Sequence, residues 1–157
     1  MKKTEHQGIA FNKLILEKVN FEIDPNYTFG KSPLEVKMGV NVEKNLSDDK
    51  KRLKIVLHVN VDLSGVDPSP MKIYTVVAGH FSLRDEQNIG ALEEFAEIQA
   101  PTIMFPFIRE VIANLSMRTD FPPLLIPPVN IWVILGKKNK EGGGKAIKVS
   151  RKKASIK

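Results

Sequence analysis

Hydrophobic and polar side chains alternate with a period of two along four segments in the first half of the 157-residue chain. Successive side chains of a β-strand point to opposite faces of its sheet, so this alternation is typical of a strand with one buried face. The pattern is most regular between Leu34 and Glu43, where every second residue is apolar. It therefore predicts four strands, at residues 11–23, 34–43, 53–63 and 71–83.

The first predicted strand is the least regular of the four. Its apolar residues from Ile15 to Ile23 are expected to share one face, although Leu14 and Leu16 disturb the alternation near the start. Short polar connections between the later strands favour antiparallel neighbours. The link at 24–33 is longer, which leaves open a crossover to a more distant strand.

The hydrophobic period changes to three and four residues after residue 90, which predicts a short helix at 91–98 and a longer one at 101–119. Pro101 and Pro106 either lie in an early turn that tolerates their missing N–H groups or mark a break before the helix. Strands followed by helices are typical of an α+β domain in which the helices pack on one face of the sheet.

A proline-rich segment follows the long helix. Between Phe121 and Pro128 there are four prolines in seven residues, a density that excludes both a helix interior and a central strand. The same segment keeps Leu124, Leu125 and Ile126. It is therefore expected to be an extended apolar loop that covers other apolar groups or is covered by them.

Two motifs in this region resemble the C-terminal signature of SecB-type protein-export chaperones. FPFIRE at 105–110 and FPPLLIPPVNI at 121–131 occur in the order and at the spacing of that signature. Each motif alone is weak, whereas the pair is specific, and the resemblance extends less strictly back to Phe11. It implies a SecB-like four-stranded antiparallel sheet backed by C-terminal helices, with residues 1–136 as the chaperone domain.

The resemblance also implies an ATP-independent holdase that binds unfolded polypeptides or preproteins in apolar grooves. For the strand residues and Phe107, packing in the core is at least as good an interpretation, whereas the proline-rich loop favours the groove for Leu124 and Ile126. The positions that match the family's groove are Tyr27, Phe29, Val36, Met38, Val40, Phe107, Leu124, Ile126, Ile131 and Leu135.

The family's docking site for the SecA motor is less well matched. Family members dock SecA through acidic residues on the exposed face of the sheet, but this sequence has Lys18, Lys72 and Tyr74 at such positions, and only Glu22 keeps its charge. Basic side chains should abolish electrostatic steering towards a basic partner. Some SecB-like proteins serve antitoxins instead, so SecA and an antitoxin both remain possible partners.

SecB-like proteins are homotetramers built as dimers of dimers, and the resemblance implies the same assembly here. The exposed edge of the first strand is the expected dimer contact, because an unpaired edge invites pairing. The helix at 101–119 is expected to join the dimers, since Met104, Phe105 and Met117 add apolar groups beyond its main apolar stripe. That stripe consists of Ile103, Phe107, Ile108, Val111, Ile112 and Leu115.

The positive charge is concentrated at the C-terminus. Residues 137–157 contain eight lysines and one arginine against Glu141, a net charge of +8, which leaves −2 for the rest of a chain with a formal charge of +6. Three consecutive glycines favour a flexible basic tail, although alternating Ile147 and Val149 leave open a short edge strand. A nucleic-acid-binding module that acts through this tail is the rival function.

No pattern in the sequence indicates catalysis. The three histidines lack carboxylates at ligand spacing, and no nucleophile, phosphate-loop or dinucleotide motif is present, so neither an enzyme, a cofactor nor a metal is expected. Arg109–Glu110 is expected to form a structural ion pair. The absence of cysteine, of a signal peptide and of an apolar run of about 20 residues fits a cytoplasmic protein without a membrane span.

Overall fold

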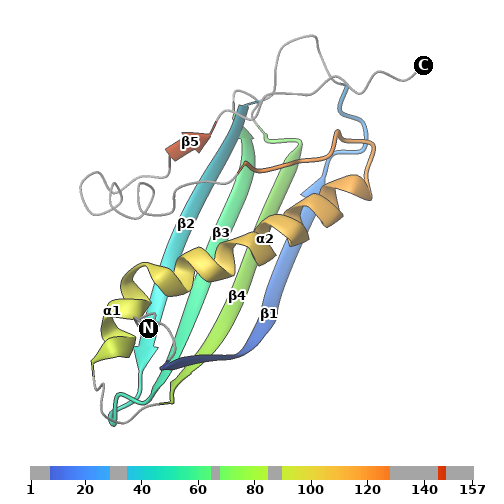
Figure 1. The fold of residues 1–157 in the computed structure, drawn as a ribbon. Coiled ribbons are helices and arrows are strands. Elements are labelled where there is room, and N and C mark those ends of the chain that lie inside the picture. The colour runs from blue at the N-terminus through green and yellow to red at the C-terminus, as the bar shows by residue number, and fades with distance from the viewer. Residues whose placement is uncertain (1–7, 29–34, 65–67, 85–89, 128–144, 148–157) are drawn as a thin grey trace.

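The computed structural model describes residues 8–28, 35–64, 68–84, 90–127 and 145–147. The four predicted strands and two predicted helices are confirmed, with boundaries that differ by a few residues (Figure 1). The α+β class is likewise confirmed. The elements in chain order are β1 (Ile9–Ile23), β2 (Glu35–Leu46), β3 (Arg52–Ser64), β4 (Met71–Leu83), α1 (Ala91–Glu97), α2 (Gln99–Met117) and β5 (Lys145–Ile147).

The strands form one antiparallel sheet in the order β1-β4-β3-β2-β5. β2, β3 and β4 follow one another as a meander, whereas the link after β1 crosses to the far side of the sheet. The crossover left open by the long link therefore occurs. It places β1 at an edge of the described sheet, as the predicted dimer contact requires.

Two irregularities in β1 explain its disturbed sequence pattern. The register shifts between Phe11 and Lys13 and again between Leu16 and Lys18. Each shift moves the later apolar residues by one position, so Leu14 and Leu16 lie opposite core positions of β4. The prediction for Ile15 was wrong, because Ile15 lies opposite Ala78 on the other face of the sheet.

Both helices cover a single face of the sheet, as predicted (Figure 1). The side chains of Met104, Ile108 and Ile112 of α2 are fully buried against the sheet. Gly79 of β4 permits this close approach, because a Cβ atom there would lie 2.7 Å from Sδ of Met104. Pro106 lies inside α2, which begins at Gln99, so neither proline breaks the helix.

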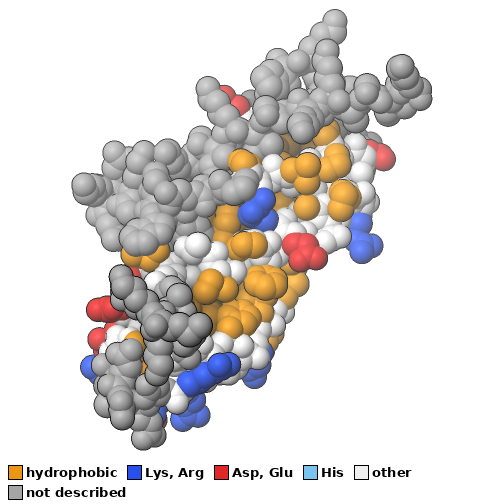
Figure 2. Space-filling model, viewed as in Figure 1, with side chains coloured by type: hydrophobic (Ala, Val, Ile, Leu, Met, Phe, Trp, Pro, Cys, Tyr) orange, Lys and Arg blue, Asp and Glu red, His pale blue; other side chains and the backbone are white. Residues whose placement is uncertain are grey.

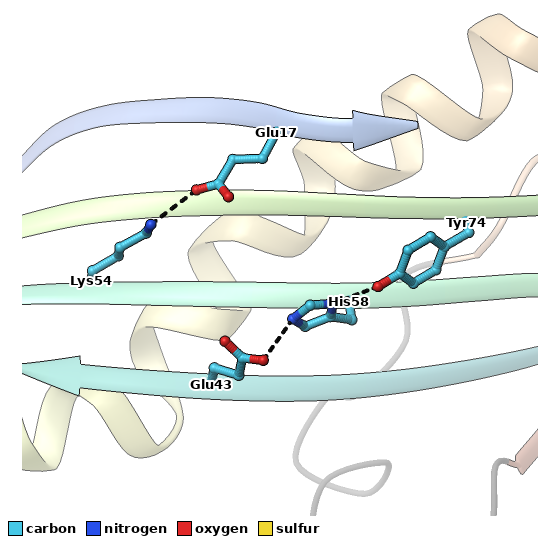
Figure 3. A network of polar contacts seen from close by, with 5 residues as sticks. All are labelled: Glu17, Glu43, Lys54, His58 and Tyr74. Carbon is cyan, nitrogen blue, oxygen red and sulfur yellow. Dashed lines mark hydrogen bonds and ion pairs between the residues drawn. The ribbon is translucent and has the colours of Figure 1, made fainter. Parts of the chain in front are cut away.

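The opposite face of the sheet, called here the open face, is mainly polar. Its centre nevertheless holds three buried apolar side chains, Val56, Val76 and Ala78. Glu17 of β1 and Lys54 of β3 approach to 3.1 Å above the intervening strand β4 (Figure 3). Long charged side chains thus shield the small apolar strip from water.

Three residues of the basic C-terminal segment form β5. Lys145, Ala146 and Ile147 pair with Met38, Lys37 and Val36 of β2. For these residues the structure shows the edge-strand alternative, and the other residues of the 137–157 segment lie outside the described residues. The division into a chaperone domain and a flexible tail stays a prediction.

Candidate functional site

Hydrogen bonds from α2 fix the path of the proline-rich segment. The N–H of Leu124 donates to Oγ of Ser116 at 2.8 Å, and that hydroxyl donates to the carbonyl of Ala113 at 2.9 Å. Nε of Arg109 donates to the carbonyl of Ile126 at 2.9 Å. Arg109 was expected to form an ion pair. In the structure its side chain anchors the backbone of the proline-rich segment.

The crossover link meets the proline-rich segment through a pair of aromatic rings. Tyr27 and Phe121 stack with ring centroids 6.2 Å apart and an interplanar angle of 15°. Leu124 and Ile126 are buried in the main core, whereas Leu125 between them is 61% exposed. The segment is therefore anchored by alternate residues and presents one large apolar side chain to solvent.

A second apolar surface lies between the middle of α2 and the start of the edge strand β1, and it is defined here as the α2–β1 surface (Figure 2). The rings of Phe11 and Phe107 stack with centroids 6.3 Å apart. Ile103 and Phe107 are 44% and 41% exposed because they project from the side of α2 away from the core. The exposed side chains of this surface are those of Phe11, Leu16, Ile103 and Phe107.

The structure separates the predicted groove residues into buried and exposed groups. Val36, Met38 and Val40 belong to the main hydrophobic core, together with Leu124 and Ile126, while Tyr27 is half-buried and Phe107 is exposed. The remaining positions, Phe29, Ile131 and Leu135, lie outside the described residues. A groove role for these residues stays a prediction.

The four residues at predicted docking positions lie close together on the open face. Glu22 and Lys72 are direct neighbours in the β1–β4 register, and Nζ of Lys18 lies 5.6 Å from the centroid of the Tyr74 ring. Glu22, Lys72 and Tyr74 also line a shallow depression of about 470 Å³. The grouping follows from the strand register, and its use in docking stays a prediction.

The sequence did not predict the polar network beside this group. Nδ1 of His58 is hydrogen-bonded to the Tyr74 hydroxyl at 2.7 Å, and its Nε2 lies 3.1 Å from Oε1 of Glu43 (Figure 3). The three side chains come from β3, β4 and β2, so only the strand register could have revealed the network. His58 lies opposite Val76, whereas His80 lies opposite Lys54, so the two histidines are not neighbours.

The described residues hold no cluster of three or more His, Cys, Asp or Glu side chains that could bind a metal ion. None of the described helices is long and apolar enough to cross a membrane.

The solved structure of the Mycobacterium tuberculosis Rv1957 SecB-like chaperone, in complex with a ChAD peptide from the Rv1956 HigA1 antitoxin, has the same fold. The TM-score is 0.64 at 13% identity, and the match covers 78% of this chain and 91% of that chain. This likeness confirms the SecB-like architecture of a sheet with helices on one face.

Sequence relatives support the same grouping. Protein-export protein SecB of Psychrobacter arcticus is 30% identical over 127 residues, which cover 78% of this chain and 82% of the relative. The uncharacterized protein MJ0357 of Methanocaldococcus jannaschii is 27% identical over 98 residues, and the match spans 62% of this chain and 63% of that protein. The family model for preprotein translocase subunit SecB matches residues 3–141. This chain therefore belongs to the SecB family of chaperones.

Proposed function

We propose that this protein is an ATP-independent holdase that binds non-native polypeptides through exposed apolar side chains. The observation that carries the proposal is where those side chains lie. Among the described residues, the large exposed hydrophobic side chains all belong to β1, α2 and the proline-rich segment. Exposed apolar areas of this kind are typical of surfaces that bind other polypeptides.

The client-binding surface is proposed to follow the junction between the crossover link and the proline-rich segment. Leu125 offers an exposed apolar side chain there, and Tyr27 is only partly covered by its stacked partner Phe121. A rigid apolar segment can contact an unfolded chain at little entropic cost, because it is already ordered before binding. Phe29, Ile131 and Leu135 are predicted to extend this surface.

The α2–β1 surface is proposed to mediate assembly into a dimer of dimers. β1 is an edge strand of the described sheet, and its Phe11 stacks on Phe107 of α2, one helical turn from the exposed Ile103. A strand edge and an adjacent apolar helix face together offer both backbone hydrogen bonds and apolar area to a second copy.

Delivery of preproteins to the Sec translocase is the first proposed destination, in keeping with the name of the relatives. A role as the chaperone of an antitoxin is the second candidate function. The observation that favours it is the open face, where Lys18 and Lys72 lie beside Glu22 and Tyr74 and remove the acidic character that a basic partner needs. Failure to bind SecA, together with binding of an antitoxin C-terminal peptide, would support the second candidate.

A test of holdase activity uses a slow-folding protein that aggregates when diluted from denaturant. Light scattering is followed without nucleotide, with and without this protein at about one oligomer per client chain. Suppression of the scattering is expected for the wild type and should be reduced for Leu125→Glu. If the folded wild type leaves the scattering unchanged at this ratio, the holdase proposal fails.

A further inference from the structure

Cationic side chains gather at one end of the open face, where β1 begins and β4 ends. Lys13 and Lys54 are both register partners of His80, on either side of it, so the three residues form a row across β1, β4 and β3. Arg52 lies opposite Ser82 in the next row of the same face. Lys13, Arg52 and Lys54 are called here the cationic cluster, and the neutral imidazole of His80 lies beside them.

The cationic cluster surrounds a depression of about 480 Å³. Asn12 and Asn45 also line it, and their amide groups are hydrogen-bond donors beside the charges, whereas the Ser47 hydroxyl already donates to Asp49. Hydrogen bonds from charged donors to carboxylates are stronger than those between neutral groups, and an arginine can bind a carboxylate with two parallel bonds. The depression therefore combines charge with the donors that an anionic group needs.

Acidic neighbours neutralise only part of this charge. Glu17 is paired with Lys54 at 3.1 Å, and Asp49 lies in the adjoining turn, where it interacts electrostatically with Arg52. Neither Lys13 nor Arg52 forms an ion pair with another described residue. Burial, followed by the charges of Lys13 and Lys54, lowers the pKa of His80, while Glu17 opposes the shift.

We propose that the cationic cluster is a docking site for an acidic segment of a partner protein. Lys13 and Lys54 are separated by two strand spacings, or about 10 Å, a distance that carboxylates a few residues apart in one peptide can match. The aromatic residue lining the depression, Phe81, is buried. The half-buried imidazole of His80 is the one remaining ring among the lining residues, a small platform for base stacking, which favours an acidic polypeptide over single-stranded nucleic acid.

The test is a binding titration of a fluorescein-labelled peptide of ten glutamates, followed by anisotropy at about 50 mM salt. Full-length wild type is compared with Lys13→Glu/Arg52→Glu. The matched control is Lys37→Glu/Lys44→Glu, which makes the same change of charge at two exposed lysines of β2 outside the cationic cluster. The cluster variant should bind the peptide at least about ten-fold more weakly, and the control should stay within about two-fold of the wild type.

Equal losses in the two variants would show that only net charge matters and would overturn the proposal, as would absence of binding to the wild type. An oligonucleotide of ten thymidines is titrated in parallel. A larger loss for the oligonucleotide than for the peptide in the cluster variant would assign the site to nucleic acid and also overturn the proposal.

Lys13→Gln/Arg52→Gln should give an intermediate loss of peptide binding, and an unchanged melting temperature in every variant excludes misfolding. Aggregation suppression should be unaffected in the cluster variant, so this test and that of the holdase proposal can fail separately.

Discussion

The buried hydroxyl of Ser116 accepts a hydrogen bond from the backbone N–H of Leu124, eight residues further along the chain. Replacing Ser116 by alanine would leave that N–H without its partner in a buried position. The expected loss is about 1–3 kcal/mol in the free energy of unfolding, measured by chemical denaturation at fixed protein concentration.

Asn114→Ala provides the control in the same helix. The Asn114 side chain is exposed and bonds only to the carbonyl of Glu110 within α2, so its loss should change stability by no more than about 0.5 kcal/mol. Equal stabilities of the Ser116 and Asn114 variants would show that the link to Leu124 contributes nothing.

Gly79→Ala should destabilise the contact between α2 and β4. The new methyl group would lie 2.7 Å from Sδ of the fully buried Met104, so the expected cost is about 1–3 kcal/mol. Gly39→Ala is the matched control, because a Cβ there would meet only Asn60, at 3.9 Å. In a Met104→Ala background most of the cost of Gly79→Ala should disappear. Strictly additive effects of the two substitutions would argue against the described packing.

The sequence predicted most of the fold because one face of each strand is buried. The regular alternation of β2 through β4 predicted those strands within a few residues, and the period of α2 predicted a helix there. The buried side of α2 was predicted only in part: Ile108 and Ile112 are buried, but Ile103 and Phe107 are exposed, and Met104 and Phe105 are buried in their place. The two register shifts in β1 were not predicted, because an extra residue in a strand leaves only a break in the alternation of apolar and polar residues. Ile15 was therefore assigned to the wrong face of the sheet.

The contacts around the candidate site were harder to predict. Arg109 and Ser116 bond to backbone groups of the proline-rich segment, and any sequence offers such groups at every position. The network of His58, Tyr74 and Glu43 depends on the register of three strands. The local sequence pattern does not predict strand register. It does predict that the proline-rich segment contains apolar residues in an extended conformation.

Stability should fall as the pH drops below about 6.5, in part because of His80. Burial, followed by the charges of Lys13 and Lys54, lowers its folded-state pKa from the ordinary value of 6.5, while Glu17 opposes the shift. Between the two pKa values the unfolded chain binds the proton more readily, so the stabilising contribution is present above pH 6.5 and is lost below it. Denaturation from pH 7.5 to 5.5 should give a smaller decline for His80→Asn than for the wild type, and parallel curves would contradict this assignment.

Ile103→Glu should disrupt assembly without unfolding the chain. Its side chain is exposed in the monomer, so a charge is tolerated there but not in an apolar interface. Light scattering after gel filtration should give four times the chain mass of 17.6 kDa for the wild type and a smaller mass for the variant. Leu125→Glu should keep the wild-type mass. A stable wild-type monomer at micromolar concentration would contradict the proposed role of the α2–β1 surface.

The binding of a permanently unfolded polypeptide tests the central claim most directly. A reduced and carboxymethylated reporter that cannot refold is labelled and titrated with the wild type in the absence of nucleotide, and its native form serves as the control. We expect saturable binding of the unfolded reporter alone, weakened about ten-fold or more by Leu125→Glu, because Leu125 is an exposed apolar group of the proposed client-binding surface and its substitution leaves the α2–β1 surface intact. A folded, assembled wild type that fails to distinguish the unfolded reporter from its native form would contradict the account.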